Sequence, residues 1–355
     1  MTMSGLQRLN RFRANLLLSK RLSGLPLTRK VRYVANATLG ELLRRRTFAS
    51  FGLRLVEISL TDRCQCRCEH CFAATEDPCL PEDELSTLEV RSLLDDLSSM
   101  GVTEVCFSGG EPLLRDDILD LVRHAYRKSL VVRLITNGVL LTDQTVLDLK
   151  QAGLNWCSVS IDSAKAELHD AFRGYRGCFE KAVNGLRFLV RHGVPCSIVT
   201  VARKGIVHTG ELEDIVLLSQ SLSVTTVRIN FPVPTGRFGN QPEQVLTREE
   251  REEVRKLLKY GIVSMESPRE GTKCTAGVTK INILPSGDVT PCVFVPLPYG
   301  NIRQEKLSEI WRDMAEYVRE YRIKGQCPMG DPFLREKLFN AANSKARTQR
   351  ERVCR

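Results

Sequence analysis

The chain has 355 residues, of which 42% are apolar and 26% charged, as in globular proteins that bury a real core and can hold two domains. No stretch reaches the roughly 20 apolar residues of a membrane-spanning helix, and we see no pattern of a secretory signal peptide. We therefore expect a cytoplasmic protein whose 13 cysteines serve metal binding or catalysis rather than structural disulfides.

The net charge of +10 belongs to the first 50 residues. They hold eleven Lys or Arg residues and a single acidic residue. The rest of the chain holds the other 41 of its 52 basic residues and 41 of its 42 acidic residues, and these charges cancel. Apolar residues at helical spacing could form one face there: Leu6, Leu9, Phe12 and Leu16. We predict a basic N-terminal extension that could contact a membrane surface or an acidic partner, act as a mitochondrial transit peptide, or pack on the body with its charges in water. We expect no nucleic-acid partner.

Strand-like and helix-like segments alternate from about residue 54 to 233. The predicted strands are 55–61, 104–108, 131–136, 156–161, 196–201 and 226–231. The predicted helices between them are 87–100, 116–128, 143–152, 178–192 and 211–221. Six strands joined by five helices predict an α/β fold with a parallel sheet and right-handed crossovers, which makes an incomplete barrel when it curls. Ligands of such sheets bind at the C-terminal ends of the strands.

The pattern changes after Val233, where prolines and glycines indicate a loop. A charged helix is predicted over 247–260, with Thr247 as its N-cap. A hairpin follows over 281–289, between Cys274 and Cys292. We therefore divide the chain into an extension over 1–50, a core over 51–240 and a C-terminal domain over 241–355.

Three cysteines follow the first predicted strand: Cys64, Cys68 and Cys71. Three thiolates can hold three irons of a 4Fe–4S cluster and leave the fourth iron open to a ligand. Zinc usually takes four ligands, often as two separated cysteine pairs. A redox-inert cluster or another kind of metal site is the alternative. Cys66 and Cys79 do not fit the spacing, so we exclude them, and we interpret His70 as loop filling.

A second motif, Ser108-Gly109-Gly110-Glu111-Pro112, follows the second strand. Its glycines let the backbone approach a ligand, and Glu111 could accept a hydrogen bond from an amine. By itself the run could be an ordinary turn.

The triad, this motif and three later segments together resemble the radical S-adenosylmethionine (SAM) superfamily. The later segments are Thr136-Asn137-Gly138, Ser160-Ile161-Asp162 and a run ending in Arg173-Gly174. The resemblance implies a partial (β/α)6 barrel with a 4Fe–4S cluster on the three cysteines. It implies contacts to SAM from Gly109, Gly110, Glu111, Pro112, Asn137, Ser160, Asp162 and Arg173. A guanidinium such as that of Arg173 matches the methionine carboxylate. Taken singly, Asp162 could instead be a turn residue and Arg173 a surface ion pair.

The region from Cys274 to Cys292 resembles the start of an auxiliary-cluster domain of the SPASM or shorter twitch type. The sequence departs from full SPASM domains because Gly330 stands where a second close cysteine is expected after Cys327. One auxiliary 4Fe–4S cluster is possible, on Cys274, Cys292, Cys327 and Cys354. The alternative is a degenerate domain without a cluster.

The resemblance implies an enzyme that reductively cleaves SAM to a 5′-deoxyadenosyl radical, which takes hydrogen from a substrate. The electron would come from a donor such as flavodoxin or ferredoxin. We expect a peptide or protein substrate, although no peptide-recognition domain is evident in the first 50 residues. One alternative is radical tailoring of a small molecule, namely a sugar, tetrapyrrole or lipid. The other is a non-catalytic iron–sulfur binding protein.

Overall fold

The computed structural model describes residues 52–73, 83–239, 241–265, 273–295, 297–319, 321 and 327–338. The predicted basic extension over 1–50 and the predicted ligand Cys354 lie outside these residues, as does Cys79. None of the described helices is both long and apolar enough to cross a membrane.

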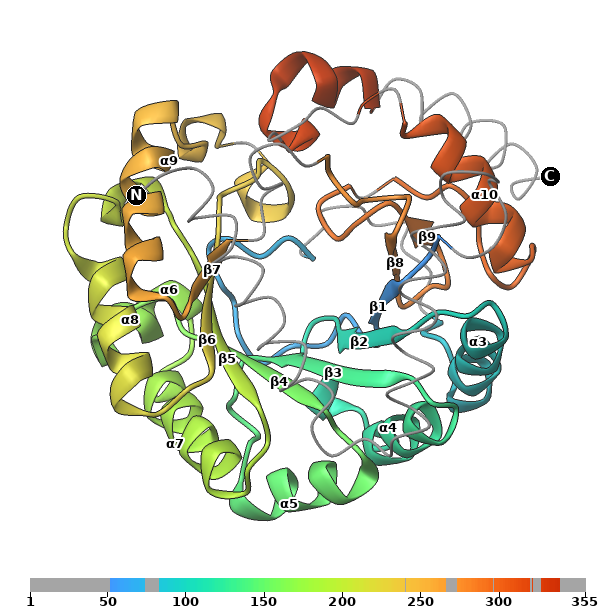
Figure 1. The fold of residues 1–355 in the computed structure, drawn as a ribbon, viewed down its shortest axis with the longest axis horizontal. Helices are drawn as coiled ribbons and strands as arrows, with labels where there is room; N and C mark the ends of the chain where they lie inside the picture. The colour runs from blue at the N-terminus through green and yellow to red at the C-terminus, as the bar shows by residue number, and fades with distance from the viewer. Residues whose placement is uncertain are drawn as a thin grey trace.

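One curved sheet organises the described part of the chain (Figure 1). Its strands run in the order β7-β6-β5-β4-β3-β2-β1-β8-β9. They are β1 (Leu55–Ser59), β2 (Glu104–Ser108), β3 (Val131–Thr136), β4 (Trp156–Ser160), β5 (Cys196–Val201), β6 (Thr226–Asn230), β7 (Val263–Met265), β8 (Lys280–Ile283) and β9 (Val289–Thr290). Strands β1 to β6 pair in parallel with their neighbours in chain order. The predicted incomplete barrel of the α/β class is confirmed, with strand ends within two residues of those predicted.

Helices cover the outer side of the curved sheet (Figure 1). They are α3 (Thr87–Ser99), α4 (Ile118–Arg127), α5 (Asp143–Ala152), α6 (Ala166–Arg173), α7 (Cys178–Arg191) and α8 (Glu211–Ser221). Helix α3 shows why they form. Ser86 and Glu89 make a reciprocal capping box at its start, which satisfies two free backbone N–H groups. Its apolar residues recur at helical spacing and are buried: Val90, Leu93, Leu94 and Leu97.

The C-terminal part of the chain extends the sheet at both edges. Strand β7 pairs in parallel with β6, and β8 pairs in parallel with β1, with Leu55 opposite Lys280. The predicted hairpin is present as antiparallel β8 and β9. The charged helix is shorter than predicted, because α9 (Arg248–Arg255) continues as a 3₁₀ turn over Lys256–Tyr260. Helix α10 (Leu307–Tyr317) packs its buried Trp311 beside Gly52. The sheet thus crosses residue 240, where we predict a domain boundary.

Candidate active site

A cavity of about 490 Å³ lies at the C-terminal ends of the parallel strands. Its lining includes the last residues of β2, β3, β4 and β5, which are Ser108, Thr136, Ser160 and Val201. The three cysteines of the predicted triad line the same cavity, as do Gly109, Gly110, Asn137, Asp162 and Arg173. A larger hollow of about 1050 Å³ between α3 and the start of α10 contains none of the predicted site residues. Sequence segments more than 100 residues apart therefore meet at the strand ends, as expected for this class of sheet.

The cysteine loop follows β1 and is anchored on α6. The backbone N–H groups of Arg67 and Glu69 donate to the carbonyls of Arg173 (2.9 Å) and Phe172 (3.0 Å). His70 stacks on the Phe172 ring, with centroids 4.9 Å apart and ring planes 2° apart. Burial lowers the pKa of His70 to about 4, so its ring is neutral near pH 7. These contacts fit the interpretation of His70 as loop filling.

The surroundings of Cys64 and Cys68 shift both thiols toward the thiolate form, which is the form that binds metals. Contact with the Cys66 thiol lowers the pKa of Cys64 to about 6, against the effect of burial. Asn137 Nδ2 adds a hydrogen bond to Cys64 Sγ at 3.7 Å. The same Cys66 contact lowers the pKa of Cys68. Among the described residues, no three His, Cys, Asp or Glu side chains converge as they would around a single metal ion. A 4Fe–4S cube holds its cysteines on separate irons, so three thiols around one cavity fit it better than they fit a single ion.

Cys66 lies at the centre of these thiols, although the spacing argument excludes it as a ligand. Its side chain contacts those of Cys64, Cys68 and Cys178. Cys178 begins α7, and the Cys66 contact lowers its pKa to about 5. Nothing in the linear spacing indicates that Cys178 belongs beside the triad, more than 100 residues away. The tertiary fold brings it there.

The two glycines of the second motif are required because two loops touch. The Gly110 N–H donates to the Thr61 carbonyl at 2.6 Å. A Cβ on Gly110 would lie 2.3 Å from the Arg63 carbonyl oxygen, and Gly109 has a φ of +135°. Only glycine fits such positions without strain. The motif therefore fixes the start of the cysteine loop directly beside the cavity.

Glu111 does not face the cavity, although we predict that it accepts a hydrogen bond from a ligand amine. Neither Glu111 nor Pro112 is among the lining residues. The buried carboxylate accepts from Thr136 Oγ1 (2.7 Å), the Asn137 N–H (2.8 Å) and the Leu113 N–H (3.1 Å). Burial raises its pKa to about 7, against these hydrogen bonds. In this structure the carboxylate joins the ends of β2 and β3.

Asp162 and Arg173 form a buried ion pair at the end of β4. Arg173 Nε and one terminal nitrogen both lie 2.7 Å from Asp162 Oδ2. The other carboxylate oxygen accepts from Thr200 Oγ1 at 3.3 Å and the Val201 N–H at 3.2 Å. Burial would raise the pKa of Asp162, but the charge of Arg173 holds it well below its usual value. The pair fixes a guanidinium at the cavity wall.

Comparison with known proteins identifies the family to which a chain with this site belongs. The model of the radical SAM superfamily matches residues 58–216, and an iron-sulfur cluster-binding domain model, SPASM, matches residues 274–345. The AdoMet-dependent heme synthase of Oleidesulfovibrio alaskensis is 34% identical over 76% of each chain. The chain belongs to the radical SAM superfamily. It is therefore an enzyme of the radical SAM class with a SPASM domain, and its cofactors are SAM and 4Fe–4S clusters.

The chain is also similar to other radical SAM proteins. The PqqA peptide cyclase of Rhodopseudomonas palustris is 31% identical, over 78% of each chain. Streptococcus suis SuiB, solved bound to S-adenosylmethionine, superposes with a TM-score of 0.63 at 18% identity, over 81% of this chain and 72% of SuiB. That likeness shows a shared fold.

The SPASM region brings its three described cysteines into one neighbourhood. Burial, followed by the charges of Cys274 and Cys327, raises the pKa of Cys292. Burial and then Cys274 raise the pKa of Cys327 to about 11. Phe294, two residues after Cys292, lines the cavity and meets the Phe72 ring edge-on at 5.9 Å. The segment that follows Cys292 therefore reaches the same cavity as the triad.

The loop after β6 closes over the cysteine loop of this radical SAM core. The Arg237 N–H donates to the Cys71 carbonyl at 3.0 Å, and Arg237 Nη1 donates to the Cys68 carbonyl at 2.7 Å. Arg237 also lines the cavity. The segment 234–237, singled out in the sequence as a loop, thus contributes a cation to the site.

Proposed function

We propose that this radical SAM enzyme acts on a tetrapyrrole that carries carboxylate side chains. The observation that carries the proposal is the charge of the cavity. The lining contains five cationic residues, namely Arg67, Arg173, Arg228, Arg237 and Lys280, and three acidic ones, namely Glu57, Asp62 and Asp162. Guanidinium and ammonium groups in a cavity select anionic ligands, and the arginine fork matches carboxylates.

The remaining walls suit a flat apolar ligand. Ile135, Val199, Phe231 and Phe294 line the same cavity. Binding sites for small molecules combine such apolar walls with a few placed polar groups. A macrocycle with carboxylates at its rim has the matching distribution of apolar and charged surface.

Two of the cations stand on strands near opposite ends of the sheet order. Lys280 begins β8 and lies 3.1 Å from Glu57 Oε2 of β1, whereas Arg228 belongs to β6. Both residues line the cavity. They therefore flank one interior space, where they could hold carboxylates on two sides of a ligand.

Similarity also supports the tetrapyrrole. Besides the Oleidesulfovibrio protein, relatives named as AdoMet-dependent heme synthase are 32% and 30% identical, and one named as Fe-coproporphyrin III synthase is 27% identical. A peptide substrate is the second candidate, because the relatives named as PqqA peptide cyclase are about as similar at 29–31%.

We assign cofactor roles to the site residues as part of this proposal. When bound, the radical cluster and SAM supply the radical that removes a hydrogen atom from the substrate, with an electron from a donor such as flavodoxin or ferredoxin. Cys64, Cys68 and Cys71 hold that cluster. The backbone of Gly109 and Gly110 and the side chains of Asn137 and Ser160 border SAM. Asp162 orients Arg173 toward the SAM carboxylate. Cys274, Cys292 and Cys327 hold one auxiliary cluster, with Cys354 as its candidate fourth ligand.

The test measures binding of iron coproporphyrin III to the anaerobically reconstituted enzyme, through the change in absorbance of the porphyrin. We expect Lys280→Met and Arg228→Met each to weaken binding by about tenfold, the effect of losing one charge-assisted hydrogen bond. Because Lys280→Met leaves Glu57 buried without its partner, the double variant with Glu57→Gln is measured as well. Lys259→Met removes an exposed lysine that pairs with Glu213 and serves as the matched control.

A second measurement on the same reconstituted enzyme, the formation of 5′-deoxyadenosine, distinguishes the two candidate substrate classes. Formation of 5′-deoxyadenosine that depends on iron coproporphyrin III, and not on its methyl esters, would support the proposal. Formation that depends only on a short precursor peptide would overturn it in favour of the second candidate.

A further inference from the structure

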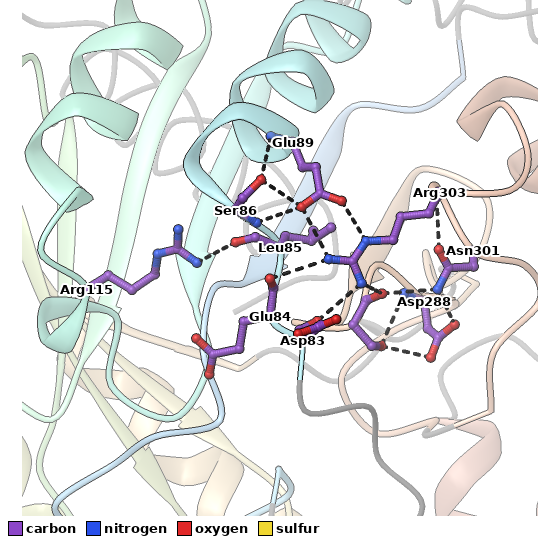
Figure 2. A network of polar contacts seen from close by, with 10 residues as sticks. Asp83, Glu84, Leu85, Ser86, Glu89, Arg115, Asp288, Asn301 and Arg303 are labelled. Atoms are coloured by element: carbon purple, nitrogen blue, oxygen red, sulfur yellow. Dashed lines mark hydrogen bonds and ion pairs between the residues drawn. The ribbon is translucent and has the colours of Figure 1, made fainter.

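Arg303, in the SPASM region, bridges to the segment that precedes α3 (Figure 2). Its Nε and Nη2 lie 2.6 Å and 3.2 Å from the two carboxylate oxygens of Glu89. Its Nη1 donates to the Asp83 carbonyl at 3.2 Å, and its Nη2 to the Glu84 carbonyl at 3.4 Å. One guanidinium thus holds both the side chain that caps α3 and the backbone just before it.

The turn between β8 and β9 fixes Arg303 from the other side. Asn301 Oδ1 accepts from the Arg303 N–H at 2.9 Å. Asn301 Nδ2 donates to Asp288 Oδ1 at 2.9 Å and to the Ser286 carbonyl at 3.1 Å. Figure 2 shows Arg303 between this turn and the start of α3. The position of the guanidinium is therefore set by the SPASM region.

Glu84, held in this way, reaches the start of the cysteine loop. Its Oε1 accepts from Thr61 Oγ1 at 2.6 Å and from the Asp62 N–H at 3.1 Å. The Thr61 carbonyl in turn accepts from the Gly110 N–H at 2.6 Å. A continuous path of hydrogen bonds therefore runs from Arg303 through Glu84 to Thr61 and to the glycine motif. The residues on this path lie outside the cavity lining, except Asp62 and Gly110.

We propose that Arg303 is a positioning residue for the radical site, which acts by holding Glu84 against Thr61 and Asp62. The SPASM region would then set the geometry of the cysteine loop relative to the glycine motif, in addition to carrying its own cysteines. This role does not depend on which substrate the enzyme takes.

A contribution to overall stability does not account for these contacts. The side chains of Arg303 and Glu89 are 32% and 37% exposed, and ion pairs at such exposure contribute little to folding. The path instead terminates at backbone groups beside the cysteines. Its loss should therefore show as local opening near Thr61 with little change in the melting temperature.

The test is amide hydrogen exchange on the reconstituted holoenzyme. We expect Arg303→Gln and Glu84→Ala each to speed exchange at Asp62 and Arg63 about tenfold, as for the loss of one hydrogen bond. Amides of β2 should be unchanged. Arg123→Gln removes an exposed arginine that pairs with Asp120 within α4 and should match the wild type. Arg303→Lys keeps the charge but loses the forked guanidinium, so its exchange rates at Asp62 and Arg63 should lie between those of the wild type and Arg303→Gln.

The exchange rate of the double variant Arg303→Gln/Glu84→Ala tests whether Arg303 acts through Glu84. If both residues act through it, the double variant exchanges no faster than Glu84→Ala alone, because coupled residues are not additive. As a second readout, the change that SAM causes in the electron paramagnetic resonance spectrum of the reduced cluster should need a several-fold higher SAM concentration in Arg303→Gln. Wild-type exchange at Asp62 and Arg63 in Arg303→Gln, or additive effects in the double variant, would overturn the proposal.

Discussion

Glu111 joins two strand ends that both border the cavity. Its carboxylate is completely buried and accepts hydrogen bonds from Thr136 and Asn137 at the end of β3. Asn137 in turn contacts Cys64. A motif residue can therefore serve its site by holding a neighbouring strand in place.

Gly110 provides the sharpest test of how tightly the two loops are joined. Gly110→Ala would place a Cβ 2.3 Å from the Arg63 carbonyl, so one loop must move. We expect SAM cleavage to fall at least a hundredfold, since small displacements at a reacting centre cost about that much. The measurement is 5′-deoxyadenosine formation by the reconstituted variant. Gly205→Ala, where a Cβ meets nothing within 4 Å, is the matched control and should behave as the wild type. Equal activity of the two variants would contradict the close contact.

Sequence patterns indicated the residues around the cavity better than they indicated what each side chain contacts. Spacing pointed to the triad, and the structure lines one cavity with all three thiols. The hydrogen-bond partners of the buried Glu111 carboxylate lie on a different strand, and the spacing did not indicate them. The placement of Cys178 beside Cys66 was missed for the same reason. Local spacing carries no information about contacts that only the tertiary fold creates.

At the scale of elements, the cysteine loop is a short segment held at both ends. The glycine motif contacts Thr61 and Arg63 at its start, and α6 contacts Arg67 and Glu69 in its middle. The loop after β6 covers Cys68 and Cys71. Three elements thus hold the thiols around the cavity, and ordering by the protein's own contacts reduces the entropy lost on cluster binding.

The three cysteines of this loop carry a testable prediction about SAM cleavage. We expect Cys64→Ala, Cys68→Ala and Cys71→Ala each to abolish SAM cleavage, because each removes a ligand of the radical cluster. Cys66→Ala should keep cleavage and full iron loading, since the spacing excludes Cys66 as a ligand. Iron per chain and 5′-deoxyadenosine are measured after anaerobic reconstitution. Cleavage by any of the three triad variants would refute the assignment.

Helix and strand positions were largely predictable because each element carries a local signal. Helix α5 begins at the N-cap Thr142 and ends at Gly153 in the left-handed conformation, and its predicted bounds match the structure. Helix α6, which was not predicted, has only eight residues, and its N-cap residue Lys165 makes no side-chain capping hydrogen bond. Strand β7 is only three residues long, too short for a recognisable alternation.

At the scale of the whole molecule, the number of clusters tests the SPASM region. Reconstituted enzyme should bind about eight irons per chain if one auxiliary 4Fe–4S cluster accompanies the radical cluster. Cys274→Ala and Cys292→Ala should each reduce this to about four and leave SAM cleavage intact, because the triad is untouched. A wild-type value of about four would show that the SPASM region carries no cluster.

The pairing of β8 with β1 was beyond sequence analysis, although the hairpin itself was predicted. Leu55 and Lys280 are opposite one another in that pairing but more than 200 residues apart in the chain. Alternating apolar residues indicate that a segment is a strand, but not which strand lies beside it. The attachment of the SPASM region to the core therefore had to come from the structure.

The same pairing restricts how this architecture can evolve. Strand β1 lies between β2 and β8, so a chain shortened to its first 240 residues would leave a row of N–H and C=O groups on β1 without partners. Exposed edges of this kind invite pairing between molecules and aggregation. Descendants that dispense with the C-terminal region would first need another segment to cover β1. Gene truncation alone is therefore a poor route from this protein to a simpler one.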